Sequence, residues 1–85
     1  MDRTTKDRLL FVLHRAWVES RLLSREGNSE QAEELADLME IVRGIIAHDK
    51  EDELDMLREG LAAYTKKFES RFDYLACLEA EPPAF

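Results

Sequence analysis

Residues 11–23 read FVLHRAWVESRLL and favour a helix with two apolar sides. At about 100° per residue, the first side contains Leu9, Val12, Leu13, Ala16, Trp17 and Leu23. The second side lies nearly opposite and contains Phe11, Val18 and Leu22, with His14 at its border. A helix inside a small bundle needs only one wide apolar side. We therefore assign the first side to the core of the chain and the second side to contact with another chain.

Glycine and cap residues around this stretch divide the chain into helices. Gly27 is the residue type that most readily adopts the left-handed conformation that ends a helix. Asn28 begins the next helix, because Gln31 follows three residues later in a capping-box arrangement. The predicted helices cover about residues 5–26, 29–47 and 50–79, with a C-terminal tail at 80–85. Since short connections make neighbouring helices antiparallel, the sequence predicts one all-α domain over residues 1–85, a small antiparallel three-helix bundle.

The third predicted helix is long, and its continuity is the open point of the fold. Its apolar spacing alternates three and four up to Phe68, and the step from Phe68 to Phe72 inserts an additional four. Because neither Gly nor Pro separates the two halves, we favour one continuous helix, about 40 Å long at about 1.5 Å per residue. The alternative is that Ser70 caps a new short helix. A continuous helix would extend beyond the second helix, so Phe68, Phe72 and Leu75 would need cover from outside the chain.

Chain length limits how far this domain can stabilise itself. A domain of 85 residues buries only about 60 to 65% of the surface of its unfolded chain, and small domains often add disulfides or oligomerise. Cys77 is the single cysteine, which excludes a disulfide within the chain. We therefore predict that a homodimer completes the helical bundle. The predicted interface contains Phe11, His14, Val18, Leu22, Phe68, Phe72 and Leu75.

The charge balance argues against nucleic acid as a partner. Twelve Lys and Arg face nineteen Asp and Glu, and the net charge of −7 opposes binding to phosphate backbones. No run approaches the roughly 20 apolar residues of a membrane span, and we expect no targeting segment at the charged N-terminus. With its single thiol, the chain is expected to be cytoplasmic. An acidic mimic of nucleic acid stays open as an alternative, with Asp49, Glu51, Asp52, Glu53 and Asp55 as its charges.

Carboxylates one turn apart on the second helix allow a second alternative. Residues 33–46, EELADLMEIVRGII, place Glu34 and Asp37 on one helix face, and carboxylate oxygens are ligands that Mg²⁺ prefers. This stretch resembles the second metal-binding helix of the all-α nucleotide pyrophosphatases of the MazG type. The resemblance implies Mg²⁺-dependent hydrolysis of nucleoside triphosphates, with Glu34 and Asp37 at the matching positions. The first helix departs from the family, because it offers Glu19 alone in place of a pair of glutamates.

No further motif in the sequence points to catalysis. We find no glycine-rich phosphate loop, no zinc-ligand spacing and no nucleophile in a motif with a base. We therefore predict a non-catalytic protein without cofactor or metal, which acts through protein–protein contact as a regulatory or accessory factor. The expected partners are a second copy of the chain and an unidentified protein, with neither nucleic acid nor membrane among them.

Overall fold

Helices make up the regular structure of this protein. The computed structural model describes residues 1–79, and this range contains no β-strand. Its α-helices are α1 (Arg3–Glu26), α2 (Ser29–His48), α3 (Leu54–Lys67) and α4 (Tyr74–Glu79), and a short 3-10 helix, η1 (Glu51–Glu53), precedes α3. The all-α prediction is therefore confirmed. The tail predicted at 80–85 lies outside the described residues.

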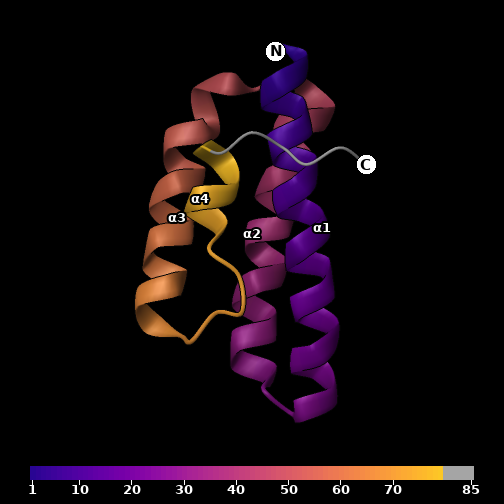
Figure 1. The fold of residues 1–85 in the computed structure, drawn as a ribbon, viewed down its shortest axis with the longest axis vertical. Coiled ribbons are helices and arrows are strands. Elements are labelled where there is room, and N and C mark those ends of the chain that lie inside the picture. The colour runs from indigo at the N-terminus through magenta and orange to yellow at the C-terminus, as the bar shows by residue number, and fades with distance from the viewer. Residues whose placement is uncertain (80–85) are drawn as a thin grey trace.

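The two longest helices, α1 and α2, form an antiparallel hairpin (Figure 1). α1 begins two residues earlier than predicted, because the carboxylate of Asp2 accepts a hydrogen bond of 2.7 Å from the backbone N–H of Thr5 and caps the helix. Gly27 ends α1 with φ of 78°, the left-handed conformation that glycine adopts without steric cost. The connection to α2 is therefore short, as the sequence predicts.

The start of α2 differs from the predicted capping box. Asn28 stands at the cap position, but its side chain makes no cap hydrogen bond. Gln31, the expected partner in the capping box, is buried. Its amide donates instead to the hydroxyl of Tyr64 and to the carbonyl of Glu69, both at 2.9 Å. The predicted capping box is therefore wrong, because acceptors from the second half of the chain bind the side chain of Gln31.

The end of α2 is fixed by an ion pair with the N-terminus. α2 ends at His48, and its cap residue Asp49 has a left-handed φ of 52°. The amino group of Met1 lies 2.8 Å from the carboxylate of Asp49 and 3.1 Å from that of Glu51. These contacts draw the start of α1 towards the connection that leads into α3.

The continuous third helix predicted from the sequence is wrong. The helix breaks near Ser70, as the alternative expected, but Ser70 is not the cap of the new helix. α3 ends at Lys67, and Phe68 adopts an extended conformation. α4 then begins at Tyr74, and Figure 1 shows this short helix turned back into the space between α3 and α1. The cap at α4 is Asp73, whose carboxylate accepts from the backbone N–H of Ala76 at 3.1 Å. A continuous helix would carry Tyr74 and Leu78 into solvent, whereas the turned-back helix buries both.

The core lies at the centre of a ring of four helices. α1 contacts α2 and α4, and α3 contacts the same two helices from the opposite side. The arrangement is thus not a simple three-helix bundle, because α4 closes the gap between α1 and α3. The buried apolar residues from α1 and α2 are Leu9, Val12, Ala16, Leu23, Leu35, Leu38, Met39, Val42 and Ile45. Those from α3 and α4 are Leu57, Leu61, Tyr64, Tyr74 and Leu78.

The buried side of α1 is rotated relative to the predicted one. Trp17, assigned to the core from its position on the helix, is 48% exposed. Glu19 is instead completely buried, in line with Ala16 and Leu23. The physical reason is α4, which packs against the side of α1 that carries Glu19 and so shifts the covered arc away from Trp17. Among residues 1–79, no helix is both long enough and apolar enough to cross a membrane.

Candidate functional site

A buried carboxylate is the most unusual chemical group in the structure. The side chain of Glu19 is 0% exposed. One carboxylate oxygen, Oε1, accepts hydrogen bonds from the hydroxyls of Tyr64 at 2.8 Å and Tyr74 at 3.0 Å. The hydroxyl oxygen of Ser70 lies 3.3 Å from the same oxygen, and its proton is shared with the closer carbonyl of Phe72 at 2.7 Å. The other oxygen, Oε2, accepts from the backbone N–H of Arg71 at 2.6 Å. Glu19 therefore joins α1 to α3, to α4 and to the connection between them.

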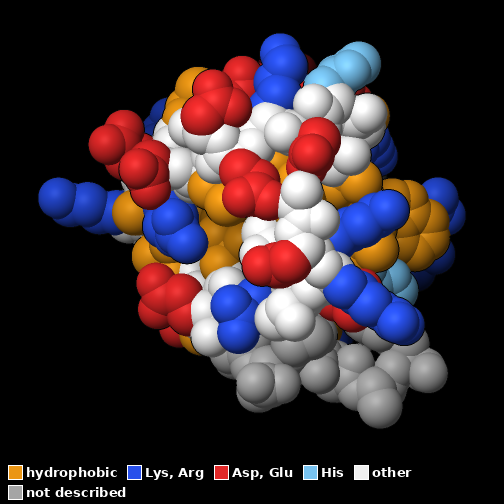
Figure 2. Space-filling view, turned by 90° about the horizontal axis from the view of Figure 1, so that it is seen from above, with side chains coloured by type: hydrophobic (Ala, Val, Ile, Leu, Met, Phe, Trp, Pro, Cys, Tyr) orange, Lys and Arg blue, Asp and Glu red, His pale blue; other side chains and the backbone are white. Residues whose placement is uncertain are grey.

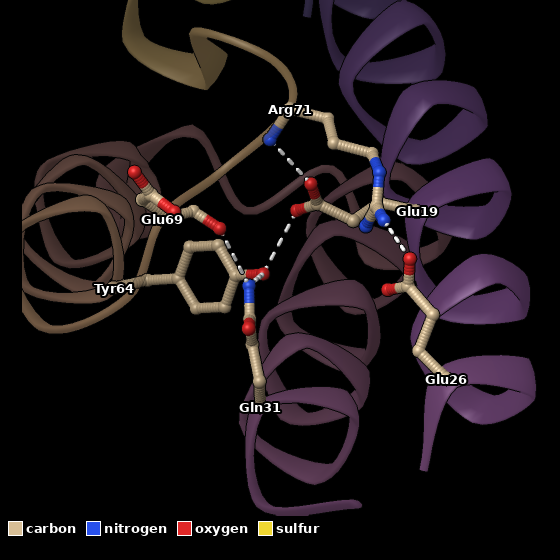
Figure 3. Close-up of polar contacts among 6 residues, drawn as sticks. All are labelled: Glu19, Glu26, Gln31, Tyr64, Glu69 and Arg71. Atoms are coloured by element: carbon tan, nitrogen blue, oxygen red, sulfur yellow. Dashed lines mark hydrogen bonds and ion pairs between the residues drawn. The ribbon is translucent and has the colours of Figure 1, made fainter. Parts of the chain in front are cut away.

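A second layer of contacts holds these donors in place (Figure 3). The amide of Gln31 on α2 donates to the hydroxyl of Tyr64, which in turn donates to Glu19. The guanidinium of Arg71 pairs with the carboxylate of Glu26 near the end of α1. All four α-helices and the 68–73 connection thus converge on one carboxylate. We call Glu19, Gln31, Tyr64, Ser70, Arg71 and Tyr74 the Glu19 network.

Burial also sets the protonation of the two tyrosines in this network. It raises the pKa of both Tyr64 and Tyr74 above the ordinary value of 10.0, and the neighbouring carboxylate of Glu19 raises both further. Both hydroxyls are therefore protonated donors at neutral pH. In the same part of the molecule, burial raises the pKa of the Cys77 thiol, which makes this cysteine a poor nucleophile.

The Glu19 network is internally saturated. Within residues 1–79, every buried side-chain nitrogen or oxygen has a hydrogen-bond partner. A surface pocket of about 360 Å³ lies beside the network and is lined by Leu23, Glu26, Asn28, Gln31, Glu69, Ser70 and Arg71. Because the donors near this pocket already have protein acceptors, the arrangement acts as a clamp between helices. It presents no orphan group to a ligand.

The residues predicted to form an interface are found in three different environments. His14 is exposed, whereas Phe11, Val18 and Leu22 are half-buried. Phe68, Phe72 and Leu75 pack against the core of their own chain, because α4 turns back and does not overhang. The guanidinium of Arg15 lies 5.0 Å from the ring centre of Phe11 and 5.1 Å from that of Phe72. The structure thus brings the two predicted surfaces together, and their contact with another chain stays a prediction.

The most exposed apolar side chains of α1 lie on a different face. Leu10 is 41% exposed and Trp17 is 48% exposed. They are seven residues apart and therefore share one face of the helix. The guanidinium of Arg21, one turn further, lies 5.3 Å from the ring centre of Trp17. This face was not selected from the sequence, although its residues follow a regular helical spacing.

A shallow groove continues this face onto α2. The groove, of about 350 Å³, is lined by Ser24, Gly27, Ser29, Ala32, Glu33 and Ala36. Its side chains are mostly small, so the backbones of α1 and α2 are accessible from outside at this end of the hairpin. We call the surface formed by Leu10, Trp17, Ser24, Ala32 and Ala36 the α1–α2 face.

Of the two carboxylates that suggested a metal site, Glu34 pairs with a lysine. The ammonium of Lys67 on α3 lies 2.6 Å from the carboxylate of Glu34 and 3.3 Å from that of Glu30. Asp37 lies one turn further along α2 and lines the same shallow pocket as Glu34 and Lys67. Among the described residues, no group of three His, Cys, Asp or Glu side chains could hold a metal ion.

The acidic cluster at the start of the third predicted helix is interspersed with cations. Asp49 and Glu51 pair with the N-terminal amine, and Asp55 lies 3.1 Å from Arg58. Figure 2, which looks onto the molecule from above, shows acidic, basic and apolar side chains mixed on this end. The visible end of the bundle therefore has no continuous acidic surface of the kind that imitates a phosphate backbone.

Glu19 is the residue of this site that the sequence reasoning missed. It stands three residues after Ala16 and four before Leu23, the spacing of a core position. That spacing was the available signal, but charged residues are rarely buried unless paired. Its hydrogen-bond donors are more than 40 residues away along the chain.

Comparisons with known proteins identify no relative of this chain. No family model, no curated protein and no solved structure matches the chain. The interpretation of its function therefore depends on the faces and contacts described above.

Proposed function

We propose that this chain is a small, non-catalytic helical protein that acts by protein–protein contact, as a cytoplasmic regulatory or accessory factor. A second copy of the chain is its first partner, and the dimer is the form that contacts further proteins. No cofactor, metal, nucleic acid or membrane takes part in this function.

One observation carries the proposal. Trp17 and Leu10, two of the largest apolar side chains of α1, are about half exposed on one helix face. Single exposed apolar residues are common on monomers, but a tryptophan and a leucine in register, next to a groove of small residues, form the type of patch that marks an interaction site. The burial of Phe72 and Leu75 against their own core favours this face over the interface predicted from the sequence.

Light scattering combined with sedimentation velocity tests self-association. Over about 1 to 100 µM, the proposal expects a mass of twice 9.9 kDa, falling towards the monomer on dilution. Trp17 is the single tryptophan, so its fluorescence reports directly on the face. The emission should shift to shorter wavelength as the protein concentration rises, because the indole enters an apolar contact.

Two matched variants separate the face from general hydrophobicity. Trp17→Glu should give a monomer with an unchanged helical circular dichroism spectrum. Met56→Glu replaces a side chain that is 49% exposed but lies on α3, and it should leave the dimer intact. A wild-type mass of 9.9 kDa at every concentration would overturn the proposal. Equal dimerisation of the wild type and Trp17→Glu would overturn the assignment of the face.

A further inference from the structure

The two helices that form the α1–α2 face carry opposite charge. α1 contains six basic and three acidic residues, whereas α2 contains five acidic residues and one basic residue. Near the α1–α2 face, the exposed charges are Arg21 and Arg25 on α1, and Glu33, Glu40 and Arg43 on α2. Glu40 pairs with Arg43, whereas among residues 1–79 Arg21, Arg25 and Glu33 form no ion pair within the chain. The charges of Arg21, Arg25 and Glu33 are therefore available to a partner.

Two-fold symmetry allows two ways to pack this face against itself. If the symmetry axis lies in the interface and is perpendicular to the helices, α1 packs on α1 of the second copy, and α2 packs on α2 of the second copy. If the axis runs along the helices, each α1 packs on α2 of the second copy. Both arrangements place antiparallel helices side by side, so helix dipoles do not distinguish between them. Side-chain charge does distinguish between them. The first arrangement places the basic helix α1 against a second basic helix, and the acidic helix α2 against a second acidic helix.

We propose, on the basis of the self-association proposed above, that the dimer has its two-fold axis along the helices. Each α1 then packs antiparallel on α2 of the second copy, and the two hairpins form a four-helix bundle at their α1–α2 faces. Arg21 of one copy faces Glu33 of the other, on both outer edges of the interface. Charge complementarity thereby fixes the partner and the orientation of the contact.

The position of the turn supports this pairing in detail. Gly27 ends α1, and Arg21 precedes it by six residues while Glu33 follows it by six. At about 1.5 Å per residue, these two side chains lie at about the same height above the turn. With an axis along the helices, residues at equal height come into contact between copies. Arg21 of each copy therefore meets Glu33 of the other without any shift along the bundle.

The apolar residues match the same register. Trp17 precedes Gly27 by ten residues, and Ala36 follows it by nine. The indole of each copy therefore lies at the height of Ala36 of the other copy. Ala36 and Ala32 line the groove on α2, and their small side chains leave space there for a ring. The tryptophan that is half exposed in the single chain thus has a complementary recess.

Charge reversal distinguishes this symmetry from its alternative. The first variant is Arg21→Glu, and the second is Glu33→Lys. Each should raise the dissociation constant of the dimer by about tenfold or more, since like charges then face one another. An equimolar mixture should dimerise as tightly as the wild type, because the mixed dimer again pairs opposite charges on both edges.

Net charge does not explain these results. The Glu33→Lys variant has less net negative charge than the wild type, so general repulsion between copies decreases while the proposal expects weaker dimerisation. The variant with both substitutions, Arg21→Glu and Glu33→Lys, restores the original net charge and should dimerise like the wild type. Lys66→Glu reverses a charge at an exposed position on α3, away from the α1–α2 face. It is the control, and it should have little effect on the dissociation constant of the dimer.

The outcomes separate the two proposals. A monomeric wild type overturns the proposed function and, with it, the symmetry. A dimeric wild type that Trp17→Glu disrupts, combined with charge-reversal variants that dimerise as tightly as the wild type, overturns only the symmetry along the helices. Failure of the variant with both substitutions to recover dimerisation, with its fold intact by circular dichroism, also overturns the symmetry.

Discussion

The carboxylate of Glu19 on α1 accepts a hydrogen bond of 2.8 Å from the hydroxyl of Tyr64 on α3. α1 and α3 lie on opposite sides of the helix ring, and this contact spans its centre. The hydroxyl also accepts from Gln31 on α2, so three long helices meet at two adjacent side chains. A buried charge is stabilising only when its hydrogen bonds are complete, and here the hydroxyls of Tyr64 and Tyr74 and the backbone N–H of Arg71 donate to it.

Replacing Glu19 should strongly destabilise the protein. Glu19→Gln keeps the size of the side chain but replaces one acceptor oxygen by a donor group, which opposes the donors already in place. The backbone N–H of Arg71 or a tyrosine hydroxyl then lacks an acceptor, and we expect a loss of about 2 to 4 kcal/mol in the free energy of unfolding. Urea denaturation, monitored by circular dichroism, measures this loss of free energy.

Glu26→Gln is the control for this substitution. It removes a carboxylate from the same helix that pairs with Arg71 but is much more exposed than Glu19. Exposed ion pairs contribute little to stability, so the urea midpoint should hardly change. Equal midpoints for Glu19→Gln and Glu26→Gln would contradict the central role of Glu19.

Removing the two tyrosine hydroxyls should have unequal effects. Tyr64→Phe removes one of the two acceptors of Gln31 and a donor to Glu19, whereas Tyr74→Phe removes a donor to Glu19 alone. We expect Tyr64→Phe to cost about 2 kcal/mol and Tyr74→Phe about 1 kcal/mol. Urea denaturation of both variants tests this order. A larger loss for Tyr74→Phe would show that the link from Gln31 through Tyr64 adds no stability.

Stability should fall at high pH because of the same tyrosines. Their folded-state pKa values are raised above the ordinary value of 10.0 by burial, with Glu19 adding to the shift. The unfolded chain therefore loses these protons first, so their contribution to stability is complete below a pH of about 10 and is lost as the pH rises above it.

Ultraviolet absorbance of tyrosinate tests this linkage. Tyr64 and Tyr74 are the only tyrosines in the chain, so the signal reports on the network alone. Ionisation should coincide with the loss of helical circular dichroism as the pH is raised. Ionisation of both side chains near pH 10.0 with the helical signal unchanged would show that the hydroxyls are accessible in the folded protein.

Two glycines provide a matched test of the hairpin. Gly27 has φ of 78°, a conformation that costs an L-residue about 1 kcal/mol, so Gly27→Ala should lower the melting temperature. Gly44 lies inside α2, and a Cβ there would meet no atom within 4 Å. Gly44→Ala should therefore raise stability by about 0.5 to 1 kcal/mol. Thermal unfolding should show a lower melting temperature for Gly27→Ala and a higher one for Gly44→Ala. A stabilising Gly27→Ala would contradict the left-handed turn.

The sequence by itself determined the elements that depend on local rules. Helical spacing and residue propensity predicted an all-α chain, and Gly27 placed the turn between the first two helices because few other residues adopt its conformation. The breadth of the apolar surface on α1 was also evident from the spacing of its residues. These features follow from interactions within a few residues, which a sequence shows directly.

Only the tertiary structure decided which side of α1 is buried and where the third helix ends. The free energy of burying Glu19 depends on donors that arrive from Tyr64, Arg71 and Tyr74, more than 40 residues away. Without those donors the carboxylate would belong in solvent and Trp17 in the core, as the local pattern suggested. The turn at 68–73 brings the donors to Glu19 and also buries Tyr74 and Leu78 of α4. The buried side of α1 and the end of α3 therefore depend on contacts between segments that are far apart in the sequence.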